Sequence, residues 1–88
     1  MTESRMWTVD IVLQETPDST EAVATLRTGD AECIGEGHAR RNPDDQAVPR
    51  IGEELATARA LSDLSAKLVQ ESASILEGHL GRHVELTR

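Results

Sequence analysis

Three arginines are the residues of this sequence whose types and spacing best suit a chemical task. Arg40 and Arg41 end a segment rich in small residues, and Arg50 stands just before a predicted helix. Guanidinium groups beside the free N–H groups of a helix start can hold a phosphate or another anion. The same region contains four acidic residues that roughly balance this charge: Asp44, Asp45, Glu53 and Glu54. We therefore expect the arginines to shape the loop by ion pairing, and an anion or RNA contact is the alternative.

Other residues with catalytic or metal-binding chemistry lack the arrangement that such chemistry needs. Gly35-Glu36-Gly37 has neither the third glycine nor the lysine of a phosphate-binding loop, so it is interpreted as a place where a helix packs closely on a strand. His79 and His83 stand four apart, but Gly81 between them disfavours the helix that would join them as zinc ligands. Cys33 is expected to face the core as a small hydrophobe. We expect no enzymatic activity, no metal and no cofactor.

The charge and the aromatic content of the chain argue against direct binding of nucleic acid. The 88 residues carry a formal net charge of −7, and Trp7 is the one aromatic residue. Proteins that bind nucleic acid usually present a basic face, and single-strand binders stack bases on aromatic side chains. A lone cysteine suits a reducing compartment, and no apolar run resembles a signal peptide or a membrane span. We expect a cytoplasmic protein with no membrane contact and weak affinity for isolated nucleic acid.

Hydrophobic periodicity predicts a single α+β domain over residues 1–88, a three-stranded antiparallel meander followed by a long C-terminal helix. Apolar and polar residues alternate at 7–13, 21–28 and 31–39, which is typical of strands in a sheet that spans 6–39. A loop at 40–50 leads to the helical region, and residues 81–88 form a tail.

The helical region at 51–80 has an apolar stripe and a row of charged residues. Arg59, Asp63 and Lys67 stand four apart, which predicts an exposed ladder of ion pairs. Glu53 and Glu54 favour a helix start nearby. The S-x-x-E spacing at 74–77 resembles a capping box, and one unbroken helix would be longer than a compact domain needs. We therefore expect a break near Ser72–Ser74 and a second short helix.

Two hairpins can be aligned independently. Gly29-Asp30 fits a two-residue turn with glycine first, which places Arg27 opposite Glu32. In the first hairpin Val12 is set opposite Val23. Both alignments gather apolar and small residues on one face and charged pairs on the other. We expect the helix to cover the face that bears Trp7, Ile11, Leu26 and Cys33.

One dense stretch, together with Trp7-Thr8-Val9-Asp10-Ile11, closely resembles a family of small actinobacterial proteins classed as a domain of unknown function. The stretch reads Gly35-x-Gly37-x-Ala39-Arg40-x-Asn42-Pro43-x-Asp45-x-x-Val48-Pro49-x-Ile51-Gly52-x-Glu54-Leu55, then Ala58-Arg59-Ala60-Leu61-Ser62-Asp63-Leu64. Members of that family have a fold like the double-stranded-RNA-binding domain, and some are induced in dormancy and likened to ribosome hibernation factors. The resemblance implies a β-β-β-α domain, a homodimer and a stress role.

These observations lead to two hypotheses of function. The first is a non-enzymatic, homodimeric, stress-associated protein that acts at the ribosome. The alternative is a protein–protein interaction module that makes no contact with RNA. For the dimer we expect an interface on the open face of the sheet, where Val12, Val23 and Ile34 are grouped, because clustered apolar residues on a sheet surface commonly mark a contact. Pairing of exposed strand edges is the rival mode.

Overall fold

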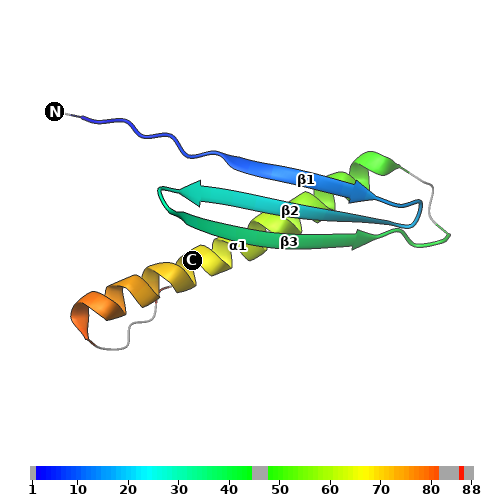
Figure 1. Ribbon diagram of the computed structural model, residues 1–88. Coiled ribbons are helices and arrows are strands. Elements are labelled where there is room, and N and C mark those ends of the chain that lie inside the picture. The colour runs from blue at the N-terminus through cyan, green and yellow to red at the C-terminus, as the bar shows by residue number, and fades with distance from the viewer. Residues whose placement is uncertain (1, 45–47, 82–85, 87–88) are drawn as a thin grey trace.

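A three-stranded sheet and one long helix make up the computed structural model, which describes residues 2–44, 48–81 and 86 (Figure 1). The elements are β1 (Val9–Glu15), β2 (Ser19–Thr28), β3 (Ala31–Arg40) and α1 (Pro49–Leu80). The strands are antiparallel in the order β1-β2-β3. This confirms the predicted α+β class, with three antiparallel strands followed by a long C-terminal helix. The tail expected at 81–88 lies mostly outside the described residues.

The strand register agrees with the one predicted from turn chemistry and charge pairing. Arg27 lies opposite Glu32, and Val12 lies opposite Val23. Gly29 has a φ of 58°, whereas no non-glycine residue of the described chain has a positive φ, so Asp30 keeps a negative φ. A positive φ at the first turn position alone is the signature of a type II′ turn, and it explains why glycine comes first.

Small residues allow the helix and the sheet to touch through their backbones. A Cβ added to Gly35 would run into the backbone of Ala60 and Leu64, and one added to Gly37 would run into the backbone of Ala56 and Ala60. This confirms that the glycines allow the helix to pack closely on the strand. The buried core is correspondingly made of small residues and two leucines: Ala22, Ala24, Leu26, Ala39, Ala56, Ala60 and Leu64.

The helix covers β2 and β3 but leaves most of β1 uncovered, which corrects one expectation. Leu26 is buried and Cys33 is half-buried, as a face beneath the helix requires. Ile11 on the same face of β1 remains 37% exposed, and Trp7, which precedes the strand, is 59% exposed. The prediction that the helix covers Trp7 and Ile11 is therefore wrong. The reason is that the helix follows the glycines, which lie on the opposite edge strand.

α1 is continuous from Pro49 to Leu80, so the expected break near Ser72–Ser74 and the second short helix are wrong. Ser72 is accommodated inside the helix because its hydroxyl donates a hydrogen bond to the Leu68 carbonyl oxygen at 2.9 Å. Because the helix already begins at Pro49, Glu53 and Glu54 lie beyond its first turn, where the helix dipole acts most strongly. The helix ends at Gly81, whose φ is 69°.

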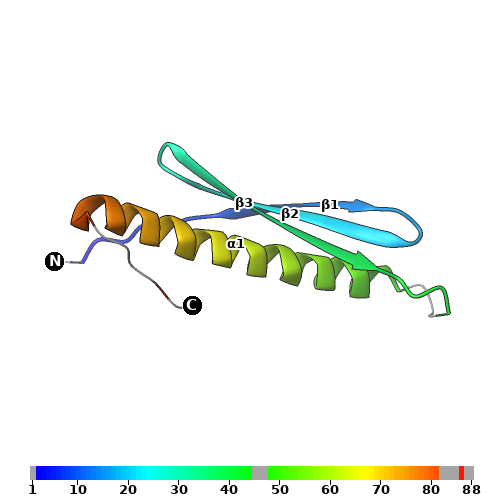
Figure 2. The same ribbon diagram turned by 90° about the horizontal axis from the view of Figure 1, so that it is seen from below.

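The molecule is long and thin for its mass. Its extents are 53 × 32 × 21 Å, and its radius of gyration is 16.8 Å, against about 12 Å for a compact domain of this length. Figure 2 shows the cause: α1 forms a separate layer on one side of the sheet and continues past the end of it. The sheet is thus covered on one side only, and incompletely. None of the helices in the described chain has the length and apolar character to cross a membrane.

Candidate functional site

Arg41, one of the three arginines considered for loop ion pairing or an anion contact, holds the turn between β1 and β2. Its Nε donates a hydrogen bond to the Pro17 carbonyl oxygen at 3.3 Å, and its Nη2 lies 3.6 Å from a carboxylate oxygen of Asp18. Its backbone N–H donates to the Asp18 carbonyl oxygen at 2.8 Å. These bonds fix the start of the loop to the β1–β2 turn, which lies at the same end of the sheet.

The other two arginines, Arg50 and Arg40, have different contacts. Arg50 pairs with Glu54 one helical turn further on, with 2.7 Å between Nε and Oε1. Arg40 ends β3 opposite Ser19, and its side chain is exposed. Arg41 and Arg50 therefore have separate ion pairs, whereas the described residues give Arg40 none.

The open face of the sheet carries the grouped apolar residues predicted for a dimer contact. Val12 is 59% exposed and lies opposite Val23, and Ile34 is 39% exposed on β3. Charged pairs surround them. Arg27 contacts Asp10 and Glu32, each at 3.1 Å. The patch is apolar at its centre, and ion pairs bound it.

The outer edge of β3 is filled by side chains of α1. The backbone N–H of Glu36 donates a hydrogen bond to the Asp63 carboxylate at 2.8 Å. Lys67 donates from Nζ to the Ile34 carbonyl oxygen at 2.9 Å and pairs with Asp63 at 3.0 Å. The hydrogen bond from the Glu36 N–H lowers the pKa of the Asp63 carboxyl, and the bond from Lys67 lowers it to a smaller extent. The Asp63 carboxylate in turn raises the pKa of Lys67.

Arg59 extends this edge contact by one further turn of the helix. Its Nη1 donates to the His38 carbonyl oxygen at 2.7 Å. Arg59, Asp63 and Lys67 were predicted to form an exposed ladder of ion pairs, and only Asp63 and Lys67 pair. All three side chains also bond to backbone groups of β3. The sequence showed that these three residues stand four apart, but it did not show that β3 would lie beside them.

The outer edge of β1 has no such cover. β1 is the other edge of the sheet, and from the rest of the described chain no hydrogen bond reaches its outer side. On the helix-facing side of this strand, Ile11 and Leu13 are 37% and 38% exposed. Figures 1 and 2 show the strand at the margin of the sheet, with the helix in another layer.

At the end of β1 two acidic side chains meet. Glu15 shares a hydrogen bond with Glu53 of α1, and this bond, with some loss of solvent and the repulsion between the two groups, raises the pKa of Glu15. The pair lies where the helix N-terminus passes the sheet. Two carboxyl groups that share one proton are a common acid–base arrangement. Here both side chains belong to an open surface, and no enclosed cavity adjoins them in the described part of the chain.

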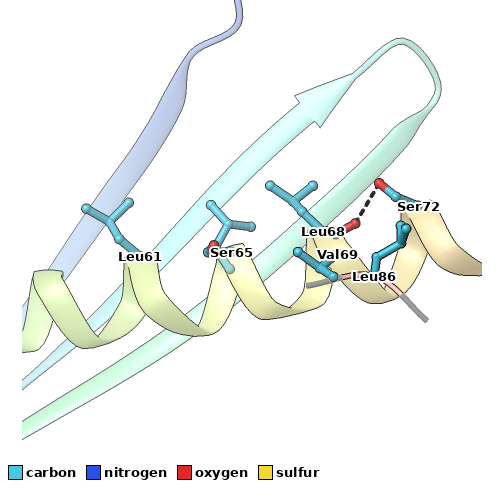
Figure 3. Close-up of a pocket in the computed structure, with 7 residues that line it drawn as sticks. Leu61, Ser65, Leu68, Val69, Ser72 and Leu86 are labelled. Carbon is cyan, nitrogen blue, oxygen red and sulfur yellow. Dashed lines mark hydrogen bonds between the residues drawn. The ribbon is translucent and has the colours of Figure 1, made fainter. Parts of the chain in front are cut away.

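An open trough of about 400 Å³ runs along one flank of α1 (Figure 3). Its lining is apolar except for two serines: Leu61, Leu64, Ser65, Leu68, Val69, Ser72 and Leu86. Catalytic pockets combine such walls with a few converging polar groups. Ser72 instead uses its hydroxyl on the helix backbone, so this trough resembles a contact surface.

The residues considered for nucleophilic or metal chemistry are not brought together. Cys33 and His38 stand five apart on β3 and so lie on opposite faces of the sheet. His38 lies 3.9 Å from Glu21 on the open face. The second histidine of the pair at 79 and 83 is outside the described residues. Within the described residues, no three His, Cys, Asp or Glu side chains gather as metal ligands would.

Comparison with known proteins identifies the family of this chain. A family model described as Rv2632c-like matches residues 5–85. The chain belongs to the Rv2632c-like family. The resemblance predicted from the sequence thus holds at the level of a family with small mycobacterial members.

Individual members lie close to this Rv2632c-like chain in sequence and in fold. It is 48% identical over 71 residues to the uncharacterized protein Mb1767 of Mycobacterium bovis, which covers 81% of this chain and 76% of that protein. It is 41% identical over 69 residues to the uncharacterized protein Rv2632c of Mycobacterium tuberculosis, with 78% and 74% covered. The crystal structure of Rv2632c matches with a TM-score of 0.84 at 34% identity, over 92% of this chain and 96% of that one.

Proposed function

We propose that this Rv2632c-like protein is a non-enzymatic homodimer of the cytoplasm that acts by binding another macromolecule. The observation that carries the proposal is its surface area of 7081 Å². A compact monomer of 9.6 kDa would expose about 5,100 Å². Part of the excess belongs to residues outside the sheet and the helix, and another part to a sheet and helix that leave much of each other uncovered. A standard interface buries about 800 Å² on each partner, which this excess supplies.

Several of the exposed side chains are apolar, as a protein interface requires. Val12 on the open face is 59% exposed, and Ile51 and Ile75 on the helix are 63% and 57% exposed. Burial of apolar area stabilises by about 25 cal/mol per Å². No large side chain of the described chain is fully buried, so a second copy has more to add here than in a domain with a well-filled core.

The absence of a convergent polar site among the described residues supports a binding role over catalysis. Cys33 and His38 lie on different faces of the sheet, and the trough along α1 is lined almost entirely by apolar side chains. Shallow apolar troughs suit another protein surface better than a substrate whose bonds must be polarised.

For the cellular role we propose association with the ribosome during stress or dormancy. This part is supported by the resemblance of residues 35–64 to proteins that are likened to ribosome hibernation factors. Arg40, to which the described residues give no ion pair, is the side chain that we assign to a phosphate contact in that complex.

The second candidate is a protein–protein interaction module without RNA contact. The specific observation in its favour is that Arg41 and Arg50 already form ion pairs with Asp18 and Glu54. A net charge of −7 also opposes binding to a polyanion, because phosphate contacts depend on cationic groups that release counterions.

Two measurements test these proposals separately. Sedimentation equilibrium of the purified protein at micromolar concentration should give twice the chain mass, and a monomer would contradict the homodimer. Sedimentation of ribosomes from starved cells should carry the protein into the ribosomal fractions, and nuclease treatment should release it. Its persistence in a nuclease-resistant complex with another protein would favour the second candidate.

A further inference from the structure

The two edges of the sheet differ in how they are protected. Along β3, Arg59, Asp63 and Lys67 occupy the backbone groups that a neighbouring strand would use. Along β1, the described chain supplies no equivalent bonds. Unprotected edge strands are templates for pairing with another strand, and proteins normally blunt them with charge, proline or a covering element. One edge of this sheet is closed by the molecule itself, and the other is open.

The backbone groups available on β1 follow from the contacts on β3. Residues of an antiparallel strand point their N–H and C=O groups alternately to the two sides. On β3, Ile34, Glu36 and His38 point outward, because they bond to α1. Their odd-numbered neighbours therefore bond to β2. Carried through the register, the outward residues of β1 are Val9, Ile11, Leu13 and Glu15.

We propose that β1 pairs antiparallel with β1 of a second copy, so that two sheets join into one six-stranded sheet. The proposal rests on the homodimer proposed above and assigns its interface. The two-fold axis passes beside Val12, the central residue of β1. Ile11 then lies opposite Leu13 of the second copy, and Val9 lies opposite Glu15. All four outward residues of each strand are used, which gives about eight backbone hydrogen bonds.

The side chains are compatible with this register on both faces. On the helix-facing side, Ile11 and Leu13 of the two copies form one apolar cluster, which covers side chains that α1 leaves 37% and 38% exposed. On the open side, Val12 meets Val12 of the second copy, and Asp10 lies opposite Gln14. No like charges stand opposite each other, as cross-strand pairing requires.

The open face is a weaker candidate for the same partner. Stacking two open faces would bury the ion pairs of Arg27 with Asp10 and Glu32, whose side chains are now exposed. Removing such charges from water costs more than weak surface pairs return. Edge pairing leaves these residues in solvent and satisfies backbone groups that otherwise bond only to water.

A disulfide across the two-fold axis tests the register directly. In the proposed sheet Val12 and its symmetry mate form a non-hydrogen-bonded pair, with Cα atoms about 4.5 Å apart, which is within the range that a disulfide spans. Val12→Cys in a Cys33→Ser background should become a covalent dimer on a non-reducing gel after mild oxidation. The matched control Val23→Cys, one strand inward on the same face, should stay monomeric on that gel.

Two like charges placed opposite each other provide a second, non-covalent test. Val12→Lys places two ammonium groups opposite each other and should raise the dissociation constant of the dimer by about tenfold or more, as measured by sedimentation equilibrium. Val23→Lys should leave it nearly unchanged, and circular dichroism of both variants establishes that they fold.

Three outcomes would overturn the assignment. Dissociation of the Val23→Lys variant with cross-linking at position 23 would place the interface on the open face. A wild-type dimer that shows no cross-link at position 12 and is unaffected by Val12→Lys would place it elsewhere, and the proposed homodimer would survive. A wild-type monomer at micromolar concentration would overturn both the pairing of β1 with β1 and the homodimer itself.

Discussion

The Asp63 carboxylate lies 2.8 Å from the backbone nitrogen of Glu36, at the position that the carbonyl oxygen of a fourth strand would otherwise take. A helix side chain thus substitutes for a strand. Because the bond forms along an edge, its removal should affect both the stability of the fold and the behaviour of that edge.

The first prediction is that Asp63→Ala lowers the melting temperature and makes β3 available for unwanted pairing. The Glu36 N–H loses its acceptor, and Lys67 loses its ion-pair partner. Thermal unfolding by circular dichroism and light scattering at high protein concentration would measure the two effects. Glu71→Ala removes an exposed acidic side chain from the same helix and serves as the control. Equal melting temperatures for the two variants would contradict the edge role of Asp63.

The second prediction concerns acid pH and the same carboxyl. Its pKa is lowered from 3.8, first by the Glu36 N–H and then by Lys67. A depressed pKa means that the stabilisation is present above the unfolded value and is lost as the pH falls through the folded value. The stability gap between wild type and Asp63→Asn should therefore be full at pH 7 and should close below about pH 4, in urea titrations at each pH.

The third prediction concerns Glu15, whose effect on stability changes with pH in the direction opposite to that of Asp63. The pKa of Glu15 is raised from 4.5, chiefly by its hydrogen bond with Glu53. The folded state then holds a proton more tightly than the unfolded state, so stability falls as the pH rises from the unfolded value through the folded one. Glu53→Gln should stabilise the protein at pH 7, and this gain should vanish below about pH 4.5. A gain that does not depend on pH would contradict the raised pKa of Glu15.

The fourth prediction compares two glycines. A Cβ at Gly37 would run into the backbone of α1, whereas one at Gly78 meets nothing within 4 Å. Gly37→Ala should destabilise the fold by about 1–3 kcal/mol, because two rigid backbones must separate. Gly78→Ala should stabilise it by about 0.5–1 kcal/mol, because alanine favours the helix interior. Urea unfolding would measure both, and a tolerated Gly37→Ala would contradict the direct backbone contact.

The fifth prediction concerns RNA. With a net charge of −7, the isolated protein should bind duplex RNA no more tightly than about 1 μM at physiological salt, as measured by fluorescence anisotropy. If the protein joins ribosomes, the double variant Arg40→Ala, Arg41→Ala should weaken that association. Arg41→Ala alone also loosens the turn at Pro17, so Arg40→Ala is the cleaner variant. Unchanged association of the double variant would remove this loop from the contact.

The sequence predicted those features that depend on neighbouring residues in a strand or turn. Gly29-Asp30 set one hairpin register, and the alternation around Val12 and Val23 set the other. The paired glycines at 35 and 37 marked the strand that a helix approaches most closely. For the two hairpins the physical cause is local, whereas the glycines mark a contact with helix residues far along the chain.

Features that depend on where the helix crosses the sheet were not predicted. The apolar alternation of Ile11 is the same whether or not a helix covers it, so the sequence could not distinguish a buried strand from an open one. The polar spacing of Arg59, Asp63 and Lys67 suited both a solvated ladder and the edge of β3. Ser74 and Glu77 have capping-box spacing, but a helix that extends past the sheet needs no interruption there.

The long, thin shape described above has a hydrodynamic consequence. A particle of 53 × 32 × 21 Å experiences more friction in solution than a sphere of the same mass. A single copy should therefore leave a gel-filtration column early, near the position of a rounder protein of considerably greater mass. Two copies joined edge to edge through β1 would be broader still, and would sediment more slowly than their doubled mass suggests. Light scattering and sedimentation equilibrium report mass independently of friction, so they separate the one-copy and two-copy states where elution volume cannot.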